Sequence, residues 1–342
     1  MNTIKINKQI PNSITIQRKT MQNIDLVYLW CDGEDPSFIK KKKERFISFG
    51  KHLSEENNGS KRYVQHDELR FSLRSAYKNI PWINHIFIVT DHQKPHWIKD
   101  HPKISIIDHS QIIPEELLPT FSSPTIEMYL SEIPNLAEHF IYSNDDMFFF
   151  RPLHPEDFFS SNGNPIVWLY PEKKLSHEKA RQISSDLSRD DWEKTLINAW
   201  LIYNSKRQTK LPFYTPAHSV DSYTKSIFNS ILSDYPELRQ ANSLPFRTGD
   251  MISRLLFSYE MIGSYGCELI IRNKTNFISR ILSRFIPREQ VAVSRENLFK
   301  LKRDLRIFNP KTFCLNNLSS DNAEEAVLFL KKLWPEPAPW EK

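Results

Sequence analysis

Four short apolar segments in the first half of the chain each end at or beside an aspartate, and this feature limits the fold most. The segments cover residues 24–31, 85–91, 104–109 and 139–146. Stretches with helical spacing or helix-start signals separate them, and strands that alternate with helices favour a mostly parallel sheet. We therefore predict an α/β, Rossmann-like fold with helices on both faces of the sheet.

The second part of the chain has a weaker pattern, in which helical stretches dominate. One strand is expected at 165–170, and helices are expected at 191–204, 219–234, 248–263 and 321–333. Helices in the first part are expected at 36–50, 67–80 and 123–134, with Asp67 as the N-cap of the second of these. A helical C-terminal part is therefore expected to follow the α/β part.

The aspartates at the strand ends predict a ligand site, because ligands bind at the carboxyl ends of the strands in open α/β sheets. We expect these side chains to gather around one crevice: Asp32, Asp91, Asp108, Asp145 and Asp146. Asp145 and Asp146 interrupt the apolar segment HFIYSNDDMFFF, where ionised carboxylates need a positive partner. Bound Mg²⁺ or Mn²⁺ is the expected partner, and a solvated turn without metal is the alternative.

Any phosphate group has to be held without a glycine-rich loop. The chain has 7 glycines and contains neither GxGxxG nor GxxxxGK[ST], which leaves side chains, helix ends or a metal ion. Arg70 and Arg74 lie four residues apart in ELRFSLRS, so they share one helix face. Two guanidinium groups on one face can grip a phosphate, and ordinary surface arginines are the alternative.

Three polar residues near expected helix starts are further candidates. His218, in YTPAHSVDSY, has a side chain that titrates near neutral pH, as a general acid or base requires. An ordinary loop histidine is the alternative. Arg247 and Asp250 lie in PFRTGDM, where the alternative is a helix N-cap beside a surface arginine.

Positive charge is concentrated late in the chain. The net charge is +5, and residues 272–306 contain ten Lys and Arg against three acidic residues. This segment suits an anionic partner such as lipid headgroups, a polyanionic glycan or nucleic acid. Within it, residues 277–286 have an apolar face with arginines between, which is typical of an interfacial membrane helix. An ordinary amphipathic core helix is the alternative.

Cysteine usage and hydropathy indicate a cytoplasmic location. The three cysteines, Cys31, Cys267 and Cys314, form no CxxC pair, so we expect neither disulfides nor a zinc site. The first 20 residues lack the apolar core of a signal peptide, and no run of 18 apolar residues exists. We expect a cytoplasmic protein that binds peripherally to the inner face of the membrane through residues 272–306.

Taken together, these segments resemble the Stealth family of sugar-1-phosphate transferases. IDLVYLWCDGEDP resembles the first conserved region, and the stretch from DELRFSLRSAYKNIPW to HFIYSNDDMFF resembles the second. PAHSVDSYTKSIF…PFRTGDM resembles the third, and FCLNN…FLKKLWPEPAPWE resembles the fourth. The four regions occur in the family's order and cover most of residues 24–341. The family includes bacterial capsule enzymes and the animal enzyme that tags lysosomal glycoproteins.

The resemblance implies a reaction and a domain organisation. Hexose-1-phosphate would pass from a nucleotide-diphospho-sugar, with a UDP-sugar as the expected donor, to a hydroxyl of a growing capsular or cell-surface glycan. Residues 1–22 are expected to form a flexible arm, and residues 23–342 a single catalytic domain. In it, 24–170 form the α/β half that binds the nucleotide-sugar, and 171–342 the mainly helical half that completes the site. Nucleic acid is not expected as a partner, and the oligomeric state is left open.

The resemblance also implies roles for the candidate residues. Asp145 and Asp146 would bind the metal and its diphosphate, with Asp32 near the nucleotide. Arg70, Arg74 and Arg247 would hold phosphate oxygens. His218 would deprotonate the acceptor hydroxyl or protonate the leaving phosphate, and Asp250 would orient a partner or bind metal.

Two departures and two rival functions accompany this interpretation. The third region commonly has a His-x-Pro element where this chain has TPAHS, and Asn316 and Asn317 stand where the fourth region usually has an aspartate. One rival is a metal-dependent glycosyltransferase that uses the same donor but attacks the sugar carbon. The other is a non-catalytic protein that binds an anionic glycan or nucleic acid through residues 272–306.

Overall fold

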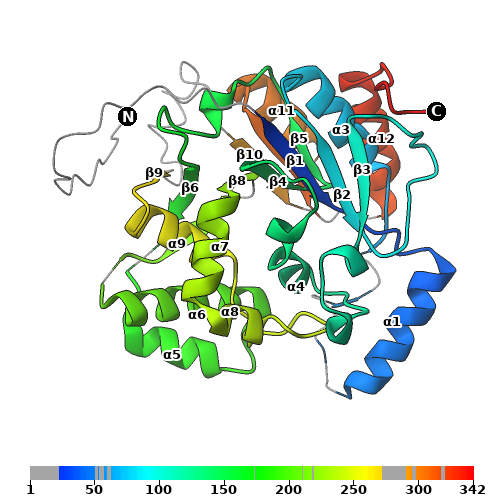
Figure 1. Ribbon diagram of the computed structural model, residues 1–342. Helices are drawn as coiled ribbons and strands as arrows, with labels where there is room; N and C mark the ends of the chain where they lie inside the picture. The colour runs from blue at the N-terminus through cyan, green and yellow to red at the C-terminus, as the bar shows by residue number, and fades with distance from the viewer. Residues whose placement is uncertain are drawn as a thin grey trace.

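A computed structural model describes residues 23–50, 53, 58–59, 63–172, 174–209, 211–217, 219–271, 290–294, 298–316 and 320–342. Three predictions lie outside these ranges: the arm at 1–22, the interfacial helix at 277–286 and the placement of His218. Figure 1 shows the described elements in chain order.

The central sheet has five strands in the order β3-β2-β1-β4-β8. The strands are β1 (Ile24–Leu29), β2 (Ile86–Thr90), β3 (Ile104–Asp108), β4 (His139–Asn144) and β8 (Asp221–Thr224). β1 pairs in parallel with both β2 and β4, β2 pairs in parallel with β3, and only β8 runs antiparallel. The predicted mostly parallel sheet is confirmed.

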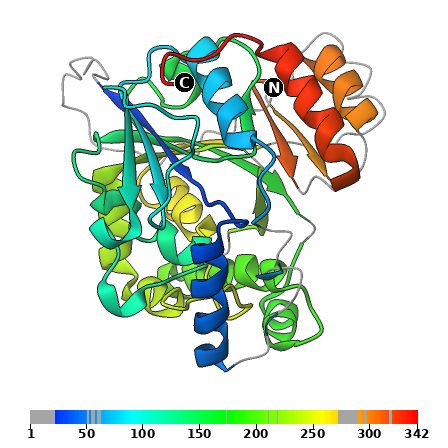
Figure 2. The ribbon, with the colours of Figure 1, turned by 90° about the vertical axis from the view of Figure 1, so that its right-hand side faces the viewer.

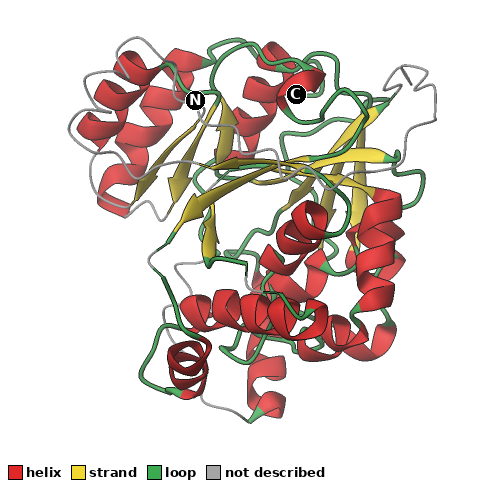
Figure 3. Ribbon diagram, turned by 90° about the vertical axis from the view of Figure 1, so that its left-hand side faces the viewer, coloured by secondary structure: helices red, strands yellow, loops and turns green. Residues whose placement is uncertain are grey.

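Helices cover both faces of this sheet (Figures 2 and 3). Successive residues of a strand point to opposite faces, so Leu26 and Tyr28 of β1 face one core and Val27 faces the other. α3 (Glu68–Asn79) packs on the first face. The second face is covered by α4 (Ser123–Glu127), α6 (Asp191–Arg207), α7 (Lys225–Asp234) and α9 (Leu255–Gly263). The predicted Rossmann-like layering is confirmed.

The second part of the chain contains more strands than the single one predicted at 165–170. β6 (Ile166–Pro171) pairs with β7 (Tyr214–Pro216) and β9 (Glu268–Ile271). β11 (Thr312–Asn316) pairs with β10 (Gln290–Ser294) and with β5 (Met147–Phe149) of the first part. The strand predicted at 165–170 is confirmed as β6. The other strands have three to five residues and distant partners, so local periodicity did not reveal them.

The predicted helices at 36–50 and 321–333 are confirmed as α1 (Pro36–Phe49) and α12 (Ser320–Leu333). The helix expected at 123–134 ends at Glu127, and the one expected at 248–263 begins only at Leu255. Three further helices were not predicted: α5 (His177–Ser185), α8 (Pro236–Ala241) and α11 (Leu298–Phe308). The expected helix at 219–234 is wrong in its first turn, because residues 221–224 form the edge strand β8. Asp67 is the N-cap residue of α3 as expected, but its side chain makes no capping hydrogen bond.

α11, α12 and β11 form a smaller core with β5. The ring of Phe148 stacks on Phe313 with 4.9 Å between centroids and on Trp334 with 5.6 Å. All three residues are buried. The C-terminal elements therefore pack directly against the first part of the chain, as Figure 1 shows.

Arg70 and Arg74 do not face a ligand site, which corrects their predicted role. Both bind the carboxylate of Glu341: Arg70 Nε lies 2.6 Å from Oε2, and Arg74 Nε lies 2.6 Å from Oε1. Arg74 also donates to the backbone oxygen of Trp334 at 3.0 Å. The side chain of Glu341 is fully buried. These arginines hold the C-terminal segment on α3, because their i, i+4 spacing fits one carboxylate.

No helix in the described part of the chain combines the length and the apolar character that a bilayer crossing requires.

We expect Glu341→Ala to lower the free energy of unfolding by about 3–5 kcal/mol, because it leaves buried Arg74 without its carboxylate. Urea unfolding near neutral pH measures this. The exposed Glu336 on the same segment gives the control Glu336→Ala, which should stay within about 0.5 kcal/mol of wild type. A Glu341→Ala variant as stable as this control would contradict the role of Glu341 in holding the C-terminal segment on α3.

The difference in the free energy of unfolding between wild type and Glu341→Ala should depend on pH. Burial alone would raise the pKa of Glu341, but hydrogen bonds from Arg74, the Ala338 N–H and Arg70 bring it below its ordinary value. A carboxyl group with a depressed folded-state pKa stabilises the protein above its unfolded-state pKa, about 4.3, and loses that contribution as the pH falls further. The gap between wild type and Glu341→Ala should therefore narrow below about pH 4.

Candidate active site

A cavity of about 380 Å³ opens at the carboxyl ends of β1, β2 and β4. β1 and the turn after it contribute Leu29, Trp30 and Cys31, while β2 and its loop contribute Val89 and Asp91. The second part of the chain contributes the start of α6 and the segment 247–254. The site therefore lies where the sequence predicted a ligand, between the two parts of the chain.

Six carboxylates line this cavity, those of Glu68, Asp91, Glu127, Asp145, Asp146 and Asp191. Glu68, at the start of α3, lies near Asp145 and Asp146 in the turn after β4. Burial, with the negative charges of Asp146 and Glu68, raises the pKa of Asp145 to about 8. Burial also raises the pKa of Glu68. In the described part of the chain, no lysine or arginine forms an ion pair with Glu68 or Asp145. Closely spaced acidic groups of this kind suit a divalent cation, which prefers oxygen ligands.

The local structure explains how the two aspartates reach this position. β4 ends at Asn144 in the central sheet, and β5 begins at Met147 in the smaller sheet, so residues 145 and 146 form the crossing between sheets. The N–H of Leu315 donates to the backbone oxygen of Asp146 at 3.0 Å. Gln65 Nε2 donates to Asp145 Oδ2 at 2.9 Å, and Trp30 Nε1 donates to Gln65 Oε1 at 3.0 Å. Hydrogen bonds thus hold the backbone of Asp146 and the carboxylate of Asp145 in place.

Two arginines, Arg247 and Arg254, line the cavity and have different surroundings. Arg254 lies 2.8 Å from both Glu127 and Asp221, so its charge is balanced within the protein. Arg247 donates from Nη2 to Ser123 Oγ at 2.9 Å, and no carboxylate in the described ranges pairs with it. Its Nε is buried and has no hydrogen-bond partner among the described residues. Arg247 is therefore the cavity's better candidate for an anionic ligand.

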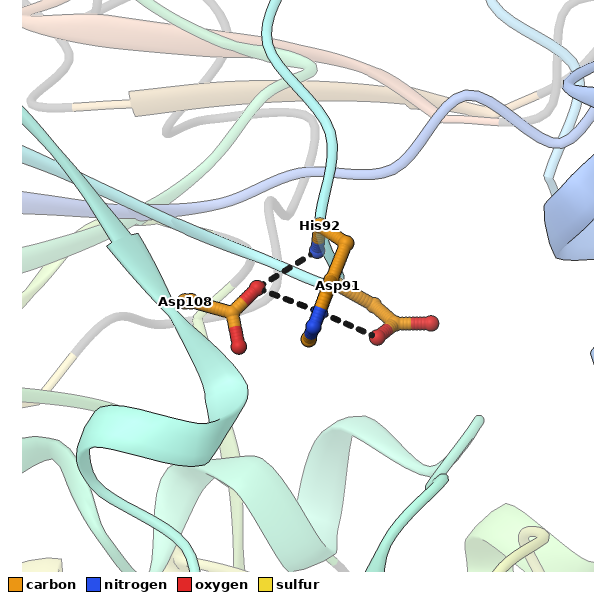
Figure 4. A group of neighbouring side chains, drawn as sticks. All are labelled: Asp91, His92 and Asp108. Carbon is orange, nitrogen blue, oxygen red and sulfur yellow. Dashed lines mark hydrogen bonds and ion pairs between the residues drawn. The ribbon is translucent and has the colours of Figure 1, made fainter.

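A second acidic group lies at the ends of β2 and β3 (Figure 4). Ligand atoms of Asp91, His92 and Asp108 lie within 4.8 Å of one another, which also fits a cation. However, Lys41 Nζ lies 2.5 Å from Asp91, and His92 Nδ1 lies 2.7 Å from Asp108. Asp108 also caps the turn at Ser110. Asp91 and Asp108 therefore already have positively charged or potentially charged partners, whereas no described lysine or arginine pairs with Glu68 or Asp145.

The other predicted site residues lie at varied distances from the cavity. Asp32 is half-buried beside it and binds the N–H of Glu34 at 2.9 Å, but neither Asp32 nor Asp108 contributes to the lining. Asp250 is exposed and does not line it. His218 is outside the described residues, but its neighbours Ala217 and Ser219 both line the cavity.

Sequence reasoning thus placed Asp91, Asp145, Asp146 and Arg247 correctly around one cavity and missed Glu68. Glu68 was not predicted because it begins a helix, where an acidic side chain is normally explained by its favourable interaction with the helix dipole. His109 was also missed. It lines the cavity, and burial lowers its pKa to about 4, so its ring is neutral at physiological pH.

Comparison with known proteins shows the following similarities. The family described as "Stealth protein CR2, conserved region 2" matches residues 62–167, which contain Glu68, Asp145 and Asp146. Capsular polysaccharide phosphotransferase cps1A of Actinobacillus pleuropneumoniae is 39% identical over 215 residues, which are 61% of this chain and 58% of that protein. Capsular polysaccharide phosphotransferase LcbA of Neisseria meningitidis is 32% identical over 302 residues, which are 87% of this chain and 78% of that protein.

The matches also differ in extent. The chain spans little more than half the length of several curated relatives, including cps1A at 58%. Among solved structures, the galactosyltransferase LgtC with donor and acceptor sugar analogues matches 92% of this chain and 96% of its own, at 11% identity and a TM-score of 0.39. The fold class described above rests on the strand order of the chain itself and not on this likeness.

We expect Asp145→Asn to raise the thermal midpoint of the metal-free protein. A carboxyl group whose folded-state pKa, about 8, exceeds its unfolded-state pKa destabilises the fold increasingly as the pH rises between these values. The gain over wild type should therefore grow from pH 5 to pH 8. Adding Mn²⁺ should raise the midpoint of wild type and leave that of the variant unchanged.

Differential scanning fluorimetry with and without chelator measures both effects. Asp186→Asn, which neutralises an exposed carboxylate on α5's C-cap, is the matched control and should respond to Mn²⁺ as wild type does. A metal-free Asp145 variant that melts below wild type at pH 8 would show that repulsion is absent.

Proposed function

Because the chain belongs to the Stealth family, we propose that it transfers a hexose-1-phosphate from a nucleotide-diphospho-sugar to a sugar hydroxyl. The donor is a UDP-sugar, and the acceptor is a growing capsular or cell-surface glycan. The observation that carries this proposal is one cavity lined by Glu68, Asp145 and Asp146 and also by Arg247. A diphosphate in this cavity can be met by positive charge both from Arg247 and from a cation bound by the acids.

Asp145 and Asp146, with Glu68, are the residues that would hold Mg²⁺ or Mn²⁺. The fit rests on the carboxylate chemistry and on the raised pKa of Asp145, which reflects burial and negative charge without an ion-paired lysine or arginine. When bound, the cation neutralises charge on the diphosphate. Gln65 orients Asp145 for this task through its hydrogen bond of 2.9 Å.

The chain's own residues supply the remaining tasks. Arg247 binds a phosphate oxygen through the guanidinium face that Ser123 leaves open. Asp32, beside the cavity at the end of β1, contacts the nucleotide. His218 lies between two residues that line the cavity and accepts the proton of the acceptor hydroxyl. Asp250 would serve as a residue that orients a neighbour, because it is exposed and lies outside the lining.

The reaction breaks and forms bonds at phosphorus. The acceptor oxygen bonds to the phosphorus that carries the sugar, and the bond from that phosphorus to the bridging oxygen breaks. The nucleoside monophosphate leaves with the bridging oxygen, and the sugar keeps its bond to the transferred phosphate. A glycosyltransferase would instead break the bond at the sugar carbon and release a nucleoside diphosphate.

Product analysis tests this function directly. We expect the purified protein with Mg²⁺, a UDP-sugar and a glycan acceptor to release UMP and to give a phosphodiester signal in ³¹P NMR. UDP release without a phosphodiester would support a glycosyltransferase. Failure of every nucleotide-sugar and of Mg²⁺ to shift the thermal midpoint would support a non-catalytic binding protein.

We expect Asp145→Asn, His218→Ala and Arg247→Ala each to lower the transfer rate by about 100-fold or more without unfolding the protein. Each removes a group that acts on charge or on a proton in the transition state. The matched controls change exposed residues of the same kind, Asp186→Asn and Arg189→Ala, and should retain wild-type turnover. Wild-type turnover in a site variant would remove that residue from the proposed mechanism.

A further inference from the structure

The outer face of α1 carries exposed apolar side chains between lysines. Ile39, Phe46 and Ile47 are 51%, 46% and 68% exposed. Lys43 lies between them at the i+4 position from Ile39, and Lys40 borders them. Positions i, i+4, i+7 and i+8 share one side of a helix, so these residues form one surface, which we call the α1 outer face.

The inner face of α1 is firmly anchored to the protein. Phe38 is buried against Tyr63 and Phe121, with ring centroids 5.4 and 5.2 Å apart. Lys41 binds Asp91 at 2.5 Å, and the ring of Phe49 lies 5.7 Å from that of Phe246. The position of the outer face is therefore fixed, and its exposure does not come from a detached helix. Figures 1 and 2 show α1 at the edge of the molecule, apart from the helices that cover the sheet.

The charged residues of α1 indicate which kind of partner binds to this face. Residues 36–49 contain Lys40, Lys41, Lys42, Lys43 and Arg45 against the single acid Glu44. No acidic residue in the described ranges forms an ion pair with Lys40 or Lys43. A helix face with large apolar side chains flanked by lysines matches the boundary between acyl chains and anionic headgroups.

We propose that the α1 outer face docks on an anionic lipid membrane. This proposal stands independently of the reaction described above. A second copy of the chain is a poorer fit, because a two-fold interface would place the same lysines opposite one another. The N-terminal residues 1–22 are a poorer fit too, since they contain four Lys and Arg and no acidic residue. A soluble polyanion would leave the three apolar side chains in water.

Docking through α1 would also fix how the cavity faces the membrane. Phe38, on the inner face of the same helix, lines the cavity together with Phe121 and Tyr63. The distance from the outer face to the cavity wall is therefore one helix diameter, about 10 Å. An acceptor carried on a membrane lipid would reach the cavity without leaving the surface.

Vesicle flotation with the purified full chain tests the proposal. Vesicles of phosphatidylcholine alone are compared with vesicles of phosphatidylcholine and phosphatidylglycerol, at low and high salt. We expect binding only to the anionic vesicles. We expect Lys40→Glu/Lys43→Glu and Ile39→Ser/Ile47→Ser each to weaken it by at least about tenfold, through lost charge attraction and lost apolar insertion respectively.

Matched controls separate the α1 outer face from general surface properties. Lys331→Glu/Lys332→Glu reverses two exposed lysines on α12, and Leu187→Ser replaces a side chain that is 93% exposed elsewhere. Both should bind anionic vesicles as wild type does, and circular dichroism confirms that every variant is folded.

Three results would overturn the proposal. One is vesicle binding that the α1 variants leave intact, as attachment through 272–306 would give. A second is equal binding to uncharged vesicles. The third is self-association, measured by sedimentation velocity, that Ile39→Ser/Ile47→Ser abolishes while no vesicle binds.

Discussion

Repulsion between Glu68, Asp145 and Asp146 is the constraint on which the site depends. Three carboxylates in one cavity stay together only because separate parts of the fold hold them there. Asp145 and Asp146 are fixed at the crossing between two sheets, and Glu68 is fixed at the start of α3. That helix is in turn fastened to the C-terminal segment by Glu341. Distant contacts therefore keep these mutually repelling carboxylates close together, and the binding of a cation would relieve their repulsion.

The two pairs of arginines show how far a sequence can be interpreted. Asp145 and Asp146 were predictable because the ends of parallel strands determine where side chains meet. Arg247 was named as a candidate from an expected helix start, although α9 begins only at Leu255. Arg70 and Arg74 looked equally suitable for phosphate, yet their partner Glu341 lies 271 and 267 residues away along the chain. No local pattern identifies such a partner. Periodicity identified α6, α7, α9 and α12 in the second part but not α5, α8 and α11. The short strands β7, β9, β10 and β11 depend on distant pairing.

Arg247 and Arg254 illustrate how surroundings decide the role of a side chain. Arg254 is neutralised by Glu127 and Asp221 and packs over the ring of Tyr142 at 5.0 Å, so it mainly supports the cavity wall. Arg247 is held by one hydroxyl and lacks a described counter-charge. Since a cation would reduce the negative charge of the acidic wall, the cavity as a whole is suited to a ligand with two or more negative charges.

The pairing of β5 with β11 has a consequence for biosynthesis. β5 begins one residue after the acidic turn, but its partner strand begins at Thr312. During translation, β1 to β4 are synthesised long before β11. Until β11 emerges, β5 lacks its partner strand, and the turn that contains the two aspartates is not held in its final position. Cotranslational folding can therefore build the central parallel strands early, while the acidic turn is completed only after β11 has been synthesised.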